Sequence, residues 1–372
     1  MDNEQAGTEK TARLMSLDAL RGFDMLFIMG GEGLVCAIAA ALGYPEFKNS
    51  FGHVAWHGLQ FMDVIFPLFL FMAGASFPFS CAKSRERGLG DGRIALKSLR
   101  RGLTLVVFGL CYAGFLSFDF AHFRAWSVLG RIGLAWMFAS WIYLLFGVKA
   151  RIGIAAGILS AVTVFTIFVT APGAVAPVDP FSPEGNFGCW LDRTVTAGHI
   201  LSKLYDPEGF AGLLPAIVTA MLGMFSGEIV RRGGTAATGR KALALLVCGV
   251  GCLAAGLALS YVFPINKKLW SPSFVLVVGG ISFMAFSLFY WLVDVRGWRK
   301  WSFFFMVIGM NSITIYLAQR IVNFRPARDF LFSGVASFFP DAWKPVVLQI
   351  GYIAVCWTFL YFLHRKRVYL KV

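Results

Sequence analysis

Charged residues are scarce in this sequence of 372 residues. Lysine, arginine, aspartate and glutamate make up 15% of it, and 58% of the residues are hydrophobic. A soluble globular domain usually carries about 25% charged residues, so the composition excludes an ordinary soluble domain. Several apolar runs reach the roughly 20 residues that a helix needs to cross a bilayer. We therefore predict an all-α, polytopic integral membrane protein, with residues 1–372 forming a single transmembrane domain.

Cysteine and histidine are also few, and neither is spaced as a metal site requires. Most of the seven cysteines fall in apolar runs, and Cys189 is the one in a predicted outer loop. No cysteine pair has the spacing of a disulfide framework or a zinc site. His53 and His57 do not form a His-Glu-x-x-His motif either. The sequence therefore predicts no metal site, and it shows no internal repeat.

The apolar runs predict about ten membrane-spanning helices. We place them at residues 17–42, 58–82, 97–117, 126–147, 151–171, 211–230, 241–262, 272–294, 301–323 and 343–363. With the N-terminus inside, most of the 34 lysines and arginines fall in cytoplasmic segments, as the positive-inside rule requires. This distribution explains the net charge of +14 without a nucleic-acid partner.

The same charge distribution predicts the topology. Both termini are expected in the cytoplasm, with residues 1–16 forming a cytoplasmic tail, and the membrane is expected to be the inner, cytoplasmic one. The longest outer segment, about 172–210, is rich in proline, glycine and acidic residues. It is too short for a domain, so we interpret it as a lid over the membrane core.

Three charged residues lie near the cytoplasmic end of the first span. Asp18, Arg21 and Asp24 are spaced three apart, which makes them neighbours on a helix, so Arg21 can reach both carboxylates. Ionisable groups inside a membrane are costly and are usually paired or functional. Two interpretations remain open, a local ion-pair cluster at the interface or a ligand site.

A second polar group lies at the outer face, where residues 51–71 lead into the second span. If the helix extends back that far, His53, His57 and Gln60 share one face. Asp63 lies deeper, and Arg131 lies at a matching depth in the fourth span, so we predict a salt bridge between them. A histidine titrates near neutral pH and suits a general base or an acyl carrier.

Glu32 adds a further carboxylate to this outer region. It lies in the outer half of the first span with no partner nearby in the sequence. We expect His53, Glu32 and Asp63 to converge on one outer cavity and to carry the chemistry. His57, which lies beside Trp56, is also consistent with a solvated position at an aromatic belt.

Six segments, taken in chain order, resemble the signatures of one family of transmembrane acyltransferases. They read RLMSLDALRGFDMLFIM, HVAWHGLQFMDVIFPLFLFMAG, RAWSVLGRI, WLDRTV followed by LYDPEGFAGLLPAI, NKKLWSPSFVL, and GMNSITIY. The family is that of heparan-α-glucosaminide N-acetyltransferase, which has bacterial members. Because the six segments run in register over about residues 13–320, most of the chain is covered by the resemblance.

The resemblance implies a reaction and a catalytic residue. An acetyl group would pass from acetyl-CoA in the cytoplasm to the amino group of a terminal glucosamine-like sugar on the outer side. His53 matches the family's catalytic histidine, acting either as a covalent acetyl carrier or as a general base. We assign Asp18, Arg21 and Asp24 to acetyl-CoA, the acyl-donor substrate. The outer substrate-binding assignments are Trp56, His57, Arg124, Arg131, Asp206, Glu208 and Asn311.

The chain departs from the family pattern at three positions. Relatives carry Asn at the position of Glu32, Gln at that of Gly130, and often Asn at that of His57. These differences bear on the acceptor more than on acyl transfer. Two alternatives stay open, a carbohydrate or solute transporter without acyl transfer and an O-acyltransferase of an envelope polysaccharide. A homodimer is also left open.

Overall fold

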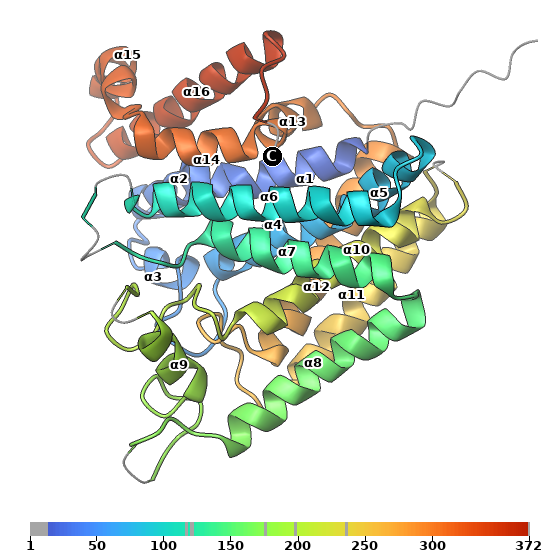
Figure 1. Ribbon diagram of the computed structural model, residues 1–372. Helices are drawn as coiled ribbons and strands as arrows, with labels where there is room; N and C mark the ends of the chain where they lie inside the picture. The colour runs from blue at the N-terminus through green and yellow to red at the C-terminus, as the bar shows by residue number, and fades with distance from the viewer. Residues whose placement is uncertain are drawn as a thin grey trace, which may run out of the picture.

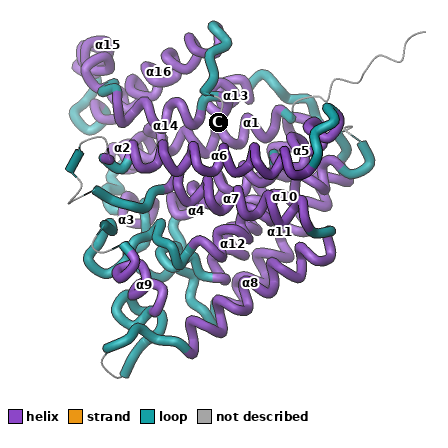
Figure 2. Tube along the Cα trace, viewed as in Figure 1, coloured by secondary structure: helices purple, strands orange, loops and turns teal. Residues whose placement is uncertain are grey.

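The helices of the protein lie side by side in one bundle, as a computed structural model shows (Figures 1 and 2). The structure describes residues 14–115, 118–119, 123–174, 177–196, 199–234 and 237–370. In these residues the β-structure is limited to an isolated bridge between Thr170 and Asn186. The prediction of an all-α protein is confirmed.

The helical elements are given in chain order. They are α1 (Met15–Leu26), η1 (Phe27–Gly31), α2 (Glu32–Ala41), α3 (Phe47–Phe51), α4 (Phe61–Ala75), α5 (Phe77–Glu86), α6 (Asp91–Tyr112), α7 (Val128–Leu145), α8 (Val148–Phe168), α9 (Phe187–Val195), α10 (Leu213–Arg231), α11 (Gly239–Leu259), α12 (Pro272–Phe289), η3 (Tyr290–Val295), α13 (Ser302–Met310), α14 (Ser312–Ile321), α15 (Arg325–Ser337) and α16 (Lys344–Arg365).

Eight helical stretches within the described residues are long and apolar enough to cross a membrane. They are Met15–Ala41, Phe61–Glu86, Val128–Leu145, Val148–Phe168, Leu213–Arg231, Gly239–Leu259, Pro272–Val295 and Lys344–Arg365. A ninth is formed if α13 and α14, which meet at a bend of 67°, count as one broken span. The protein is therefore polytopic, while the predicted count of ten and the cytoplasmic termini stay predictions.

The predicted span at 97–117 corresponds to α6, and it is absent from these eight. With 22 residues, α6 is long enough to cross a bilayer. Its apolar half, however, is preceded by Lys97, Arg100 and Arg101, which lower its mean hydropathy. Of these three, Arg101 contacts α7, where its guanidinium lies over the ring of Trp136 at 4.4 Å, while Lys97 and Arg100 are exposed.

Helices α4, α10 and α12 form the centre of the bundle, and most of their residues are buried. Small residues let these helices approach closely, as is common between membrane helices. A Cβ atom at Gly223 of α10 would lie 1.9 Å from the carbonyl oxygen of Phe71 in α4, so only glycine fits there. This tight contact fixes α4, whose first turn carries Asp63.

Helix α8 lies at the edge of the bundle and runs obliquely to its neighbours (Figure 1). It packs on α10 and, less extensively, on α12. Most of its side chains are exposed, and Arg151, Ala155 and Leu159 are its buried residues. As a result, a groove runs along one side of α8.

The segment between the first two spans does not continue the second helix backwards. Helix α4 begins at Phe61, with Gln60 as its N-cap, and residues 52–60 are non-helical. The condition under which His53, His57 and Gln60 would share one helix face is therefore not met. The reason is local. The side chain of Asp63 accepts a hydrogen bond from the backbone of Gln60 in a capping box, and this box sets the N-terminus of α4 at Phe61.

Candidate active site

Asp63 is the organising residue of the outer loop. It is the third residue of α4 and is fully buried. Its Oδ2 atom accepts hydrogen bonds from the backbone N–H groups of Gln60, at 3.1 Å, and Val54, at 3.3 Å. One carboxylate thus caps the helix and holds the loop that precedes it. The loop carries His53, so the position of the imidazole follows from that of Asp63.

His53 and Asp63 form a direct pair. Nδ1 of His53 lies 2.8 Å from Oδ1 of Asp63. Since an ionised carboxylate only accepts hydrogen bonds, Nδ1 is the donor, and in the neutral imidazole Nε2 is then the nitrogen that can act as a base or nucleophile. The His53 side chain is 51% exposed, whereas Asp63 has no exposed surface. A buried carboxylate therefore orients a histidine that an outer ligand can reach.

Lys267 completes this group from a distant part of the chain. It lies in the loop between α11 and α12, and its Nζ atom is 3.3 Å from Oδ1 of Asp63 and 3.2 Å from Nδ1 of His53. Burial lowers the pKa of Lys267, although the charges of Asp63 and Glu208 oppose this effect. Lys267, rather than Arg131, is thus the cation that compensates Asp63.

The predicted salt bridge between Asp63 and Arg131 is wrong. Arg131 instead donates from one terminal nitrogen to the carbonyl oxygen of Gly209 at 2.6 Å. Its guanidinium lies over the ring of Trp270, 5.0 Å from the centroid. Its other two nitrogens have no hydrogen-bond partner among the described residues. The two side chains do not meet because the loop before α12 supplies a different partner to each. Lys267 of this loop pairs with Asp63, and Trp270 packs against Arg131.

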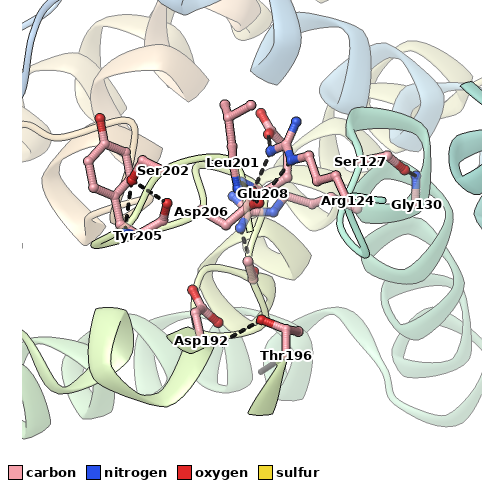
Figure 3. A network of polar contacts seen from close by, with 12 residues as sticks. Arg124, Ser127, Gly130, Asp192, Thr196, Leu201, Ser202, Tyr205, Asp206 and Glu208 are labelled. Atoms are coloured by element: carbon pink, nitrogen blue, oxygen red, sulfur yellow. Dashed lines mark hydrogen bonds and ion pairs between the residues drawn. The ribbon is translucent and has the colours of Figure 1, made fainter. Parts of the chain in front are cut away.

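Arg124, Asp206 and Glu208 form a second ionic group at the outer side (Figure 3). Nε of Arg124 donates to Oδ2 of Asp206 at 2.8 Å, and its NH2 group contacts both Asp206 and Glu208. Burial lowers the pKa of Arg124, but the two carboxylates outweigh it and hold the pKa above its ordinary value. Asp206 also accepts backbone hydrogen bonds from Leu201 and Glu208, so it shapes the loop itself.

A cavity of about 190 Å³ lies between α1, α4, α7 and α14. Its polar lining comes from both ionic groups and from α14, and the remaining lining residues are apolar. The polar lining residues are His53, Glu208, Lys267, Ser312 and Tyr316. The cavity therefore links the two groups, because His53 and Lys267 of the first group and Glu208 of the second all line it.

The other predicted outer residues lie around this cavity rather than on it. The Trp56 indole donates to the carbonyl oxygen of Phe181 at 2.8 Å and packs against Tyr205. His57 lies 3.3 Å from the side chain of Asn266, and burial lowers its pKa, opposed by Asp179. Both contacts hold the His53 loop against neighbouring outer segments.

Two further predicted residues are separated from His53. Asn311 is buried at the bend between α13 and α14, where its side chain reaches only the carbonyl oxygen of Val307 among the described residues, at 3.4 Å. Glu32 follows the π-helical distortion at η1 and lies near Gly52, where a Cβ atom would be 3.9 Å from its Oε1. Glu32 borders the His53 loop, but no hydrogen bond or ion pair joins it to His53 in the described part of the chain.

The cluster of Asp18, Arg21 and Asp24, at the end predicted to be cytoplasmic, is only partly formed. Arg21 lies 3.5 Å from Asp18 and also donates to Ser76 and to the carbonyl oxygen of Met72 in α4. Asp24 is fully buried, and neither of its oxygens has a hydrogen-bond partner among the described residues. The expectation that Arg21 bridges both carboxylates is therefore wrong for Asp24.

Lys267 is the residue that sequence reasoning missed as part of the site. It belongs to the segment NKKLWSPSFVL, which resembles a family signature, and it is followed by Lys268. Two adjacent lysines on the outer side run against the positive-inside rule, and this was the available signal. Lys268 also has a partner here, because its Nζ atom donates to the carbonyl oxygen of Val54 at 2.8 Å.

The fold and the site together define a class, namely a polytopic α-helical membrane protein with a histidine–carboxylate pair at a cavity between its helices. No protein-family model matches the chain. Over 97% of its length the chain is 26% identical to heparan-alpha-glucosaminide N-acetyltransferase from Homo sapiens and 25% identical to the protein of the same name from Mus musculus. The chain is thus a distant relative of these two proteins, as its motifs predicted. It spans 60% of the length of each.

Proposed function

We propose that the protein is a transmembrane acyltransferase, which moves an acetyl group from cytoplasmic acetyl-CoA to an amino sugar at the outer face. The observation that carries this proposal is the group formed by His53, Asp63 and Lys267 at one narrow apolar cavity. A base held in one tautomer beside a cation is suited to transfer of an acyl group to an amine. The two relatives are N-acetyltransferases by name, which agrees with this assignment.

The cavity is suited to an acyl donor that enters from the cytoplasmic side. Its lining includes Met25 of α1 and Phe69 of α4, which lie further toward the cytoplasm than His53. One turn beyond them in the same direction, Arg21 contacts α4 at Met72 and Ser76. An apolar cavity suits the acyl end of the thioester, and an arginine one turn away on the same helix would complement the phosphates of coenzyme A.

With His53 as the general base, acyl transfer takes place in a single displacement step. The amine nitrogen of the acceptor attacks the thioester carbonyl, Nε2 of His53 takes the amine proton, and the coenzyme A thiolate leaves. Asp63 stabilises the imidazolium by holding Nδ1–H, and Lys267 keeps Asp63 ionised. A covalent acetyl-imidazole on Nε2 would use the same groups in two steps.

The acceptor would meet His53 from the outer surface. There, the segment after α9 carries Asp206 and Glu208, and Glu208 reaches the cavity. A carboxylate oxygen of Glu208 would accept a hydrogen bond from an amine or hydroxyl group of the sugar while the charge of Glu208 stays paired with Arg124. We propose that residues 172–210, which include α9, cover the site as a lid, because Phe181 and Tyr205 both contact Trp56 of the His53 loop.

The test uses purified protein in proteoliposomes with labelled acetyl-CoA on one side and a panel of amino sugars and sugar alcohols on the other. Transfer of label to an amino sugar, read by mass spectrometry, supports the proposal. Label on a hydroxyl would indicate O-acyl transfer. Uptake of unmodified sugar without transfer would indicate a transporter and contradict the proposal. His57→Ala serves as a control for His53→Ala, since His57 lies outside the cavity.

A further inference from the structure

A second cavity, larger than the one at His53, is lined by none of the residues of the His53 site. It is a groove of about 1320 Å³ between α8, α10, α11 and α12. Its walls are apolar for most of their length, with Leu159 and Val164 of α8 facing Leu222 of α10 and Leu276 of α12. The groove exists because α8 packs on α10 but stands away from α11.

The charged lining residues lie at one end of the groove. Lys149 begins α8, and Glu228, Arg231 and Arg232 end α10. Glu228 is already compensated, because its Oε1 atom lies 2.8 Å from Arg151. No described residue forms a salt bridge with the three remaining cations. This end of the groove therefore has an excess of positive charge, at the side predicted to be cytoplasmic.

The dimensions fit an amphiphile that lies along α8. From Lys149 to Val164 the helix rises about 22 Å at 1.5 Å per residue, more than half of the roughly 30 Å hydrocarbon core of a bilayer. An occupant needs an anionic head at the basic end and flexible apolar chains beyond it. A phospholipid has this combination, and basic pockets between membrane helices commonly bind anionic headgroups.

A second copy of the chain is a poorer occupant. Two copies related by a twofold axis in one membrane would bring identical surfaces together. The three uncompensated cations of one copy would then approach those of the other, and like charges repel. Charge complementarity therefore favours an anionic lipid over self-association.

We propose that this groove is a binding site for an anionic phospholipid of the cytoplasmic leaflet. Its phosphate contacts Lys149, Arg231 and Arg232, and its acyl chains fill the space between α8 and the bundle. The lipid supplies the packing that α8 lacks toward α11 and stabilises its position. This assignment is independent of the acyl-transfer proposal, because it concerns a different cavity.

The test measures lipid binding by the full-length protein and does not depend on activity. Phosphatidylglycerol and phosphatidylcholine with matched acyl chains are titrated into detergent-purified protein. Bound lipid is followed by native mass spectrometry and the unfolding midpoint by a thermal scan. We expect phosphatidylglycerol, but not phosphatidylcholine, to bind with a defined stoichiometry and to raise the midpoint. Equal effects of the two lipids would overturn the proposal.

Two matched pairs of variants locate the site. The triple variant Lys149→Gln, Arg231→Gln and Arg232→Gln should weaken phosphatidylglycerol binding on the order of a hundredfold, since each basic residue near an anionic lipid contributes about fivefold. The control Lys83→Gln, Arg87→Gln and Arg93→Gln removes the same charge from exposed positions elsewhere. Equal weakening in both would show a diffuse charge effect and overturn the assignment.

The second pair tests the apolar walls. Ala156→Trp places a large ring in the groove, whereas Ala161→Trp does so at an exposed position of α8 that does not line it. Only the first should displace the lipid. Unchanged lipid binding in Ala156→Trp would contradict the proposal. If the unsubstituted protein binds no lipid but forms dimers, and Ala156→Trp abolishes these dimers, the groove is instead the contact site for a second copy of the chain.

Discussion

The charged residues at the two ends of the first and second spans are compensated in different ways. At the end predicted to face outward, Asp63 pairs with His53 and with Lys267, which lies more than two hundred residues further along the chain. At the end predicted to be cytoplasmic, Arg21 reaches Asp18 three residues away at 3.5 Å, and Asp24 has no hydrogen-bond partner among the described residues. The outer group joins charged side chains from distant parts of the chain, whereas Arg21 pairs with a carboxylate on its own helix and otherwise donates to the uncharged groups of Met72 and Ser76.

The group around Asp63 is therefore preorganised, whereas the group around Asp24 lacks a partner that a ligand could supply. A fully compensated buried carboxylate fixes the groups around it, as general-base chemistry requires. A buried carboxylate without a partner is costly and contributes nothing to rigidity. We therefore expect substitutions at the outer end to reduce activity and stability, and substitutions at Asp24 to have little effect on stability. The four predictions below are ordered from the largest effect to the smallest.

The largest expected effect is that of His53→Ala on acyl transfer. A positioned general base contributes roughly 10²–10⁴-fold to the rate, so transfer should fall by about that factor. His57→Ala should lose far less, because its ring contacts Asn266 rather than the cavity. The measurement is the initial rate of label transfer by protein that remains monodisperse. Near-normal turnover by His53→Ala would remove the catalytic assignment.

The second prediction concerns the partner of Asp63. Removing one side of a buried ion pair typically costs about 3–5 kcal/mol, so Asp63→Asn and Lys267→Met should each lower the thermal stability in detergent. Their double variant should lose clearly less than the sum. The matched cycle with Asp63→Asn and Arg131→Gln should be additive, because those side chains form no ion pair. Coupling in the second cycle and none in the first would restore Arg131 as the partner.

The third prediction uses Asp192, an outer carboxylate that forms no ion pair with any described residue. Burial raises the pKa of Asp192 to about 6, above the 3.8 expected for an unfolded chain. The protonated form is therefore favoured by folding, so this contribution is present below about pH 4 and is lost as the pH rises through 6. Asp192→Asn should remove up to about 3 kcal/mol of this pH dependence, since one pKa unit corresponds to about 1.4 kcal/mol.

The measurement for Asp192 is the unfolding midpoint in detergent from pH 4 to pH 8, compared with that of Asp192→Asn. The variant should gain relative stability as the pH rises. Asp179→Asn is the control for removing an exposed carboxylate from the same segment, where Asp179 accepts a hydrogen bond from the backbone of Phe181 and its charge acts on His57. Parallel pH curves for wild type and Asp192→Asn would show that the buried carboxyl does not titrate in this range.

The smallest expected effect is that of Asp24→Asn. The side chain is fully buried and its oxygens have no hydrogen-bond partner in the described residues, so the amide should be neutral or stabilising by about 1 kcal/mol. A thermal scan of Asp24→Asn beside Asp63→Asn tests the contrast between the two ends directly. A loss at Asp24 as large as that at Asp63 would show that a partner compensates Asp24 in the folded protein.

Much of the fold followed from patterns that are local in the sequence. The apolar runs predicted eight of the described membrane-spanning stretches, and their bounds are close to those expected. The two exceptions have local causes as well, the basic residues in the first half of α6 and the bend between α13 and α14. His53 and Asp63 were identified because polar groups at the edge of an apolar run are unusual.

The partners of these charged residues could not be predicted as well from the sequence. Spacing along a helix predicted that Arg21 bridges Asp18 and Asp24. Similar expected depth in the membrane predicted a salt bridge between Asp63 and Arg131. The first holds for Asp18 alone and the second is wrong. Both inferences treated helices as straight rods at known positions. The capping box at Gln60 and the loop that carries Lys267 set the real contacts, and neither is visible in spacing.

The sequence by itself thus determined that this protein is a helical membrane protein, where most of its spans lie, and which outer residues are unusual. It did so because hydrophobicity and helical periodicity are properties of neighbouring residues. The tertiary structure alone decided that Lys267 compensates Asp63, that Asp24 has no hydrogen-bond partner among the described residues, and that α8 leaves a groove against α11. These outcomes depend on how closely helices approach and where loops cross, which is fixed by side-chain packing between segments far apart in the chain.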